Sequence, residues 1–99
     1  MTEGVLSGME RDIVSAIMRF LKNEVSCFAW KTHGNQFSAG IPDIIACVHG
    51  RFVAFEVKQP GGKPTKLQEA TLRRIGAAGG VATVVHSLNE AKEALKNVK

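Results

Sequence analysis

The sequence predicts an α/β domain in which the elements follow the order αβββαβα and helices flank a mixed sheet. Three observations predict this class: a helical pattern near the N-terminus, two β-branched or aromatic runs joined by His49-Gly50, and a further strand pattern between two helical ones. The chain has 99 residues, of which 44% are apolar and 22% charged, as in an ordinary globular protein. We therefore expect a single domain covering residues 1–99.

The first helix is expected over residues 7–23, followed by a short strand at residues 27–32 and a polar loop. Ser7-Gly8-Met9-Glu10 has the pattern of a capping box. In this motif the side chains of the first and last residue, here Ser7 and Glu10, each accept a hydrogen bond from the backbone N–H of the other. Apolar residues then recur at helical spacing. They are Met9, Ile13, Ala16, Ile17, Phe20 and Leu21.

A β-hairpin is expected next, with strands over residues 41–48 and 51–58. His49-Gly50 between them suits a two-residue turn. The run Ile44-Ile45-Ala46-Cys47-Val48 is apolar without alternation, which is typical of a strand covered on both faces.

The second half of the chain predicts a loop, a helix, a strand and a last helix. Residues 59–64 contain two prolines and two glycines and cannot continue a strand. Thr65-Lys66-Leu67-Gln68 repeats the capping-box pattern and starts a helix that should end near Gly76 or Gly79-Gly80. A strand is expected over residues 81–86, and Ser87 should cap a helix running to Lys96.

Composition restricts the class of protein further. The net charge of +4 suits a polyanionic partner, although it is also common among small soluble domains. Cys27 and Cys47 are too few for a disulfide scaffold, so both are interpreted as small core residues in a reducing compartment. The sequence has neither a secretory signal pattern nor an apolar stretch long enough for a membrane span. We expect an intracellular, soluble protein, in the cytoplasm of a bacterial cell or of a phage-infected host.

Two acids and a lysine on the predicted hairpin are the candidates for chemistry. If His49-Gly50 is the turn, Val48 pairs with Arg51, and counting outward places Asp43 opposite Glu56. Alternation then sets Lys58 on the same face as Glu56. Like charges in directly opposed positions repel unless something compensates, and a divalent cation would compensate.

The same residues resemble the PD-(D/E)xK nuclease superfamily and, within it, the VRR-NUC (virus-type replication-repair nuclease) domain. The matching segments are Gly40-Ile41-Pro42-Asp43, Phe55-Glu56-Val57-Lys58, Gln68 and Gly79-Gly80, and the resemblance runs from residue 10 to residue 86. It implies a restriction-endonuclease-like core and cleavage of DNA that depends on Mg²⁺ or Mn²⁺.

The resemblance also implies roles for individual residues. Asp43 and Glu56 would bind the metal, with the backbone carbonyl of Val57 as a further ligand, and Lys58 would assist the attacking water. Glu10 would contribute from the first helix through a water molecule, and Gln68 would brace the site. Related nucleases often carry a tyrosine four residues after the glutamine, where this chain has Leu72.

Each candidate also has a purely structural alternative. Glu10 and Gln68 each fit a capping box, and both roles can coexist. Asp43 could be a turn residue after a proline, and Lys58 could be a strand-end lysine that reaches to water. Glu56 lies between two apolar residues and has little structural reason to be acidic.

Several basic residues are candidates for contacts with DNA phosphates. The loop containing Lys31 and His33, with Asn35 and Gln36, could equally be an ordinary polar loop. Arg73 and Arg74 could be a solvated helix face, and Phe28 and Trp30 are interpreted as core residues. The full set of candidates is Lys31, His33, Lys63, Lys66, Arg73 and Arg74.

The sequence therefore predicts a metal-dependent, structure-specific DNA endonuclease. A chain of 99 residues has little surface for reading base sequence, so a homodimer that cuts branched DNA, with a four-way (Holliday) junction as substrate, is the expected form. The alternatives are a catalytically silent nucleic-acid-binding module, and a nuclease acting on flaps, nicks or RNA. The first helix and the segment from Trp30 to Phe37 are the candidate dimer surfaces.

Overall fold

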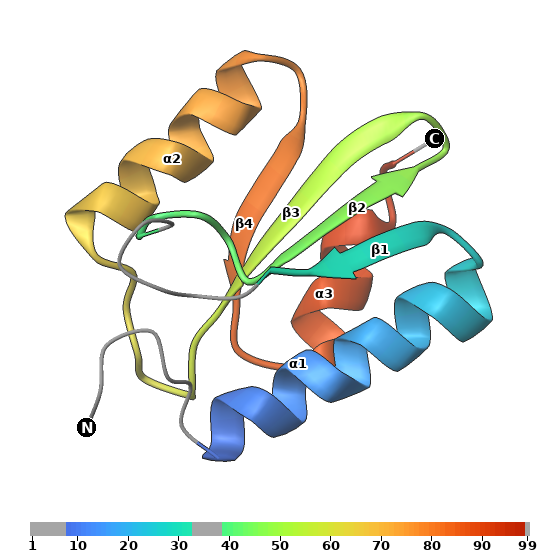
Figure 1. Cartoon of the computed structure of the whole chain (residues 1–99), viewed down its shortest axis with the longest axis horizontal. Coiled ribbons are helices and arrows are strands. Elements are labelled where there is room, and N and C mark those ends of the chain that lie inside the picture. The colour runs from blue at the N-terminus through green and yellow to red at the C-terminus, as the bar shows by residue number, and fades with distance from the viewer. Residues whose placement is uncertain (1–7, 33–38, 99) are drawn as a thin grey trace.

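The computed structural model describes residues 8–32 and 39–98, and its elements follow the predicted αβββαβα order (Figure 1). In the described ranges, no helix is both long and apolar enough to cross a membrane. The elements are α1 (Gly8–Phe20), a π-helical turn η1 (Leu21–Val25), β1 (Phe28–Lys31), β2 (Ile44–Val48), β3 (Arg51–Val57), α2 (Lys66–Ala77), β4 (Val81–Val85) and α3 (Leu88–Leu95).

The four strands form one mixed sheet in the order β1-β2-β3-β4. β1 and β2 are antiparallel, as are β2 and β3, whereas β3 and β4 are parallel and are connected through α2. Figure 1 shows α2 on one side of the sheet and α1 and α3 on the other. This arrangement confirms the predicted class, a mixed sheet flanked by helices.

The β2–β3 hairpin has the predicted turn and the predicted register. Val48 pairs with Arg51, and the ladder continues outward to the pair formed by Ile44 and Phe55. His49 and Gly50 both have positive φ, at 51° and 78°, as a two-residue type I′ turn requires. Glycine reaches this region without strain, and the turn therefore fixes which residues face one another across the hairpin.

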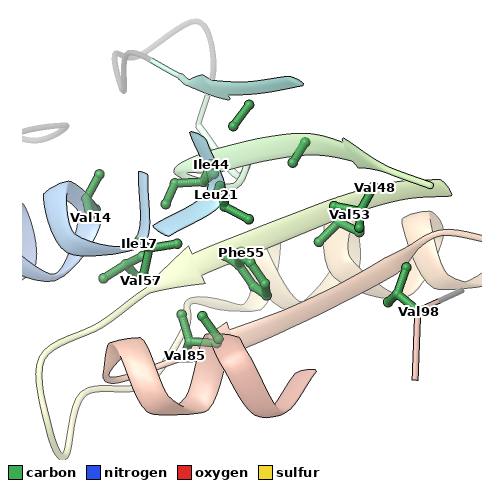
Figure 2. Close-up of a cluster of buried hydrophobic side chains, with 13 residues drawn as sticks. Val14, Ile17, Leu21, Ile44, Val48, Val53, Phe55, Val57, Val85 and Val98 are labelled. Atoms are coloured by element: carbon green, nitrogen blue, oxygen red, sulfur yellow. The ribbon is translucent and has the colours of Figure 1, made fainter. Parts of the chain in front are cut away.

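The face of the sheet toward α1 and α3 carries the main hydrophobic core. Figure 2 shows Ile44, Val53 and Phe55 of β2 and β3 gathered with Val14 and Ile17 of α1, and Ala91 of α3 belongs to the same cluster. Full burial of a side chain of this kind contributes roughly 1.5–3 kcal/mol. The fully buried members of this cluster are Val14, Ile17, Leu21, Ile44, Val53, Phe55, Val57, Val85 and Ala91.

The prediction that β2 is covered on both faces is wrong. Its residues alternate, with Ile44, Ala46 and Val48 buried, Ile45 half-buried and Cys47 exposed. The reason is the position of α2, which contacts β4, borders a hollow beside Phe52 at the start of β3, and leaves the β2 side open. β3 is instead the strand buried on both faces, from residue 53 to residue 57.

Two further expectations need correction at the level of single residues. Cys47 is exposed and Cys27 is only half-buried, so Cys47 is not a core residue; both thiols are free. The α-helical part of the first helix ends at Phe20, before the expected end at residue 23, and continues as the wider turn η1. That turn is closed by Ser26 at φ 58° and by the Cys27 N–H, which donates to the Leu21 carbonyl at 3.2 Å.

Candidate active site

Asp43 lies in a bend immediately before β2, whereas the sequence predicted that the strand would begin at residue 41. The backbone of this bend is held from the β1 side by Thr32. The Thr32 N–H donates to the Asp43 carbonyl at 2.9 Å, and the Thr32 hydroxyl donates to the Pro42 carbonyl at 2.6 Å. Pro42 itself is fully buried. The Asp43 side chain therefore projects from a backbone that hydrogen bonds hold in place on both sides of its Cα atom.

The backbone conformation and close packing at position 40 explain why the motif before Asp43 begins with a glycine. Its φ is +89°, a conformation that side-chain-bearing residues rarely adopt. A Cβ atom at this position would also lie 2.7 Å from Cγ of Leu67 on α2. The chain thus passes close under the start of α2 before it turns into the Asp43 bend.

The carboxyl groups of Asp43 and Glu56 converge at the open end of the β2–β3 hairpin. The Val57 N–H donates to Oδ2 of Asp43 at 2.8 Å, which ties the Asp43 side chain to β3. The Asp43 and Glu56 carboxyl groups also lie close enough for each to perturb the pKa of the other. The residues that the hairpin count placed opposite each other are therefore neighbours.

Glu56 is a buried acid without a full set of partners. The residue is 2% exposed, and among the described residues its Oε1 atom is buried without any hydrogen-bond partner. Burial, followed by the nearby negative charge of Asp43, raises the pKa of Glu56 to about 8. An orphaned buried carboxylate oxygen beside a second carboxyl group is costly unless a proton or a cation compensates it.

Lys58 supplies positive charge on the same side of β3. Its Nζ atom lies 3.7 Å from Oε2 of Glu56, and its side chain is 18% exposed. Burial raises the pKa of Asp43, while the bond from the Val57 N–H, the Glu56 carboxyl and the charge of Lys58 act in the opposite direction. The lysine therefore offsets only part of the cost of holding two acids together.

Glu10 approaches this group from α1. Its Oε2 atom accepts a hydrogen bond from the Gln59 N–H at 3.1 Å, which joins the start of α1 to the residue after Lys58. The charge of Glu10 also acts to raise the pKa of Asp43. In the described part of the chain, no set of three or more acid, His or Cys side chains is close enough to hold a metal together.

Gln68 is engaged at the start of α2. Its Oε1 atom accepts from the Thr65 N–H at 2.8 Å, and its own N–H donates to the Thr65 hydroxyl at 3.1 Å. This is the capping box that the sequence predicted, formed in full. The structure brings Asp43, Glu56 and Lys58 together, with Glu10 nearby. The hydrogen bonds described for Gln68 are instead made to Thr65 in the helix cap.

The basic candidates for DNA contact are spread over several elements. Lys31 is on β1, Lys63 is in the loop after β3, and Lys66 begins α2, while Arg73 and Arg74 lie further along that helix. All five are exposed. His33, with its neighbours Asn35 and Gln36, lies outside the described residues, as does Ser7.

Two features of the site region were not found from the sequence. Thr32 fixes the Asp43 backbone, and a threonine at the end of a short strand gives no signal of that role. Phe28 and Trp30 were interpreted as core residues, which is wrong because they are 66% and 54% exposed. Their alternation with Ala29 placed them on one face, but only the tertiary structure shows that this face is open.

Comparison with known proteins supports the fold alone. One solved structure, described as a VRR_NUC domain, matches with a TM-score of 0.74 and 18% sequence identity, and the match covers 94% of this chain and 100% of the other. No family model and no curated protein match the sequence. The chain thus has the fold of a VRR_NUC domain, with the mixed sheet and flanking helices of the restriction-endonuclease-like class.

Proposed function

We propose that the protein is a DNA endonuclease of the PD-(D/E)xK type that requires Mg²⁺ or Mn²⁺. One observation carries the proposal: the Glu56 carboxyl group, whose buried Oε1 has no hydrogen-bond partner among the described residues, lies near the Asp43 carboxyl group, and its Oε2 lies 3.7 Å from Nζ of Lys58. A protein that only binds nucleic acid has no need of a buried acid pair that weakens its own fold. The VRR_NUC fold supports the same conclusion.

The donor set fits a hard divalent cation. Mg²⁺ is commonly held by one or two carboxylates, with water and phosphate oxygens completing its shell. Asp43 and Glu56 would supply the carboxylates, the Val57 carbonyl a further oxygen, and Glu10 an outer contact through water. Within residues 8–32 and 39–98 no third acid joins these two closely enough to form a larger cluster, and two convergent acids match such a site.

Each residue then has a distinct part in phosphodiester hydrolysis. Asp43 and Glu56 would hold the metal, which would supply Lewis acidity toward the charge that develops on the scissile phosphate. Lys58 orients the attacking water and stabilises the added negative charge, because its ammonium group already lies beside Glu56. The Thr32 N–H holds the Asp43 backbone, and the Val57 N–H holds the Asp43 carboxylate in the position where it would bind the metal.

The substrate and assembly belong to the same proposal. Exposed lysines and arginines, from the set Lys31, Lys63, Lys66, Arg73 and Arg74, would contact phosphates without reading bases. A homodimer would hold two catalytic centres in symmetric relation, and a four-way junction presents two equivalent strands to such a pair. We therefore propose a dimeric resolvase of branched DNA. The alternatives are cleavage of flaps, nicks or RNA, and a silent binding module.

A nuclease assay with defined substrates tests the proposal. The purified protein is incubated with single-stranded, duplex, flapped, nicked and four-way DNA and with an RNA hairpin, in Mg²⁺, Mn²⁺ or EDTA. Asp43→Asn, Glu56→Gln and Lys58→Met should each lower the cleavage rate by roughly 100-fold or more, as expected when charge at a reacting phosphate is lost. Glu93→Gln, on the exposed side of α3, is a matched acid-to-amide control that should cleave normally.

Full cleavage in EDTA, or by Glu56→Gln, would refute the metal-dependent mechanism. Tight DNA binding without cleavage of any substrate would favour the silent binding module. Equal rates on linear duplex and four-way DNA would refute the preference for junctions while the nuclease assignment stands.

A further inference from the structure

Five apolar or weakly polar side chains, four exposed and one half-buried, lie together on one face of the sheet. They come from three adjacent strands, β1, β2 and the start of β3. Three of them are aromatic and are 66%, 54% and 46% exposed, in the order Phe28, Trp30 and Phe52. We call this surface the apolar face, and its members are Phe28, Trp30, Ile45, Cys47 and Phe52.

The strand register shows that these residues form one continuous surface. Phe28 pairs with Cys47 and Trp30 pairs with Ile45 between β1 and β2, and Cys47 pairs with Phe52 between β2 and β3. Directly paired side chains lie on the same face of a sheet. The rings of Phe28 and Trp30 also stack, with their centroids 6.4 Å apart.

The position of the helices explains why this face is open. α1 and α3 cover the opposite side of the sheet, and α2 covers the same side only toward β4 (Figure 1). None of the described helices covers the half of this face that β1 and β2 form. The exposed portions of the three aromatic residues alone amount to roughly 300 Å², since each such side chain presents about 150–250 Å² in full. That is somewhat over a third of the ~800 Å² per partner in an interface of ordinary size, so these three rings would form the centre of such an interface.

The composition of the apolar face favours a protein as its partner. None of its five members carries a charge, and alternation directs the neighbouring Lys31 to the other side of β1. A nucleic acid lying across this surface would need cations between the aromatic rings, and a protein interface is instead depleted of charge at its centre and rich in aromatic residues. A uniformly apolar patch of this kind is complementary to itself, which a two-fold interface requires.

We propose that the apolar face is the surface through which two copies of this chain form the dimer. The inference rests on the dimeric nuclease proposed above and specifies its interface. Asp43 lies two residues before Ile45 on the same hairpin, roughly 7 Å along the strand direction. Pairing through the apolar face would therefore fix the two acidic sites at opposite, symmetry-related edges of one interface, rather than on unrelated surfaces.

The single tryptophan of the chain makes the interface measurable. In the wild-type protein, light scattering should give the mass of a dimer, and dilution should shift the Trp30 emission to longer wavelength as the ring becomes solvated. Phe28→Lys keeps the reporter and inserts a charge. It should weaken dimerisation by roughly 30-fold or more, the effect of losing an aromatic hot spot, and show the solvated emission at all concentrations.

Met9→Lys is the matched control, because Met9 is also an exposed apolar residue, at 53%, but lies on α1. It should dimerise as the wild type does, and far-UV circular dichroism should be the same for all three proteins. If the wild type is a dimer and Phe28→Lys dimerises equally well, the apolar face is not the interface, although the dimer stands.

A wild-type protein that is monomeric at tens of micromolar would overturn both the interface and the dimer. Cleavage of DNA by that monomer would still leave the nuclease assignment intact, so the two failures are distinguishable. Strong quenching of Trp30 in a monomeric wild type by an unstructured oligonucleotide would also overturn the proposal, because it would make unpaired bases the occupant of this surface.

Discussion

The two faces of the sheet differ in what their side chains do. On the face toward α1 and α3, most β2 and β3 side chains are aliphatic or aromatic and buried, as Ile44, Val53 and Phe55 illustrate. On the opposite face, the same two strands carry a buried acid, Glu56, and leave Cys47 uncovered. Adjacent positions on one strand therefore belong to different environments.

This difference separates the origin of stability from the origin of function. The covered face buries apolar area at little cost, which is the main favourable contribution to folding. The other face concentrates features that oppose folding of the isolated chain: two neighbouring acids, a buried carboxylate oxygen without a hydrogen-bond partner among the described residues, and exposed aromatic rings. Such features are expected where a protein binds a cation, a substrate or a partner.

The largest expected effect compares two phenylalanines on β3. Phe55 is fully buried on the covered face, whereas Phe52 is 46% exposed on the other. Phe55→Ala should lower the free energy of unfolding by roughly 3–5 kcal/mol, the usual cost of such a cavity. Phe52→Ala should cost under about 1 kcal/mol, because much of that ring is already in water. Urea denaturation at low protein concentration measures both, and equal losses would contradict the division between the faces.

The second expected effect is that removing the Glu56 carboxyl group stabilises the fold, because its charged form is costly in the folded state. The pKa of Glu56 is raised to about 8 from an ordinary value of 4.5, so the folded state binds the proton more tightly than the unfolded state. In EDTA the wild type should therefore lose stability as the pH rises from about 4.5 to 8. That difference corresponds to on the order of 3 kcal/mol at pH 7.

Glu56→Gln has no such proton to lose and should be the more stable protein at pH 7.5 in EDTA. Added Mg²⁺ or Mn²⁺ should stabilise the wild type and leave the glutamine variant unchanged. Thermal melts at pH 5 and pH 7.5, with and without metal, provide the test. A wild type that is equally stable at both pH values without metal would argue against a strained acid pair.

The smallest expected effect concerns His86, which lies just beyond β4 at the same end of the sheet as Lys58. Its Nδ1 atom lies 2.9 Å from Oε1 of Glu90, and its Nε2 atom lies 3.0 Å from the Gly62 carbonyl. Both neighbours are acceptors, so a ring protonated at both nitrogens satisfies this geometry. These contacts, led by the bond to Glu90, raise the pKa of His86 above its usual 6.5.

The connection between His86 and the loop after β3 should accordingly be complete at acid pH and weaken as the pH rises through the raised pKa. Proton NMR of the imidazole should give a midpoint above 6.5. Glu90→Gln should move that midpoint down, whereas Glu93→Gln on the same helix should not. A His86 midpoint unaffected by Glu90→Gln would mean that the ion pair does not form in solution.

The sequence by itself determined the hairpin and therefore the acid pair. His49-Gly50 can adopt the positive φ values of a tight turn, and that local chemistry fixes the register by counting. Once Val48 pairs with Arg51, the approach of Asp43 to Glu56 follows. The helices were equally predictable, because capping residues and helical spacing are properties of neighbours in the chain. The cap formed by Thr65 and Gln68 is one example.

The tertiary structure alone decided which side chains are covered. Nothing local distinguishes Ile44 from Cys47 in an apolar run, yet one is fully buried and the other exposed. Likewise, Phe28 and Trp30 have the composition of core residues and still lie on the surface. The physical reason is that burial depends on where a distant helix lies. α2 extends over β4 and stops short of β1 and β2, and this placement is set by packing between segments that are far apart in the chain.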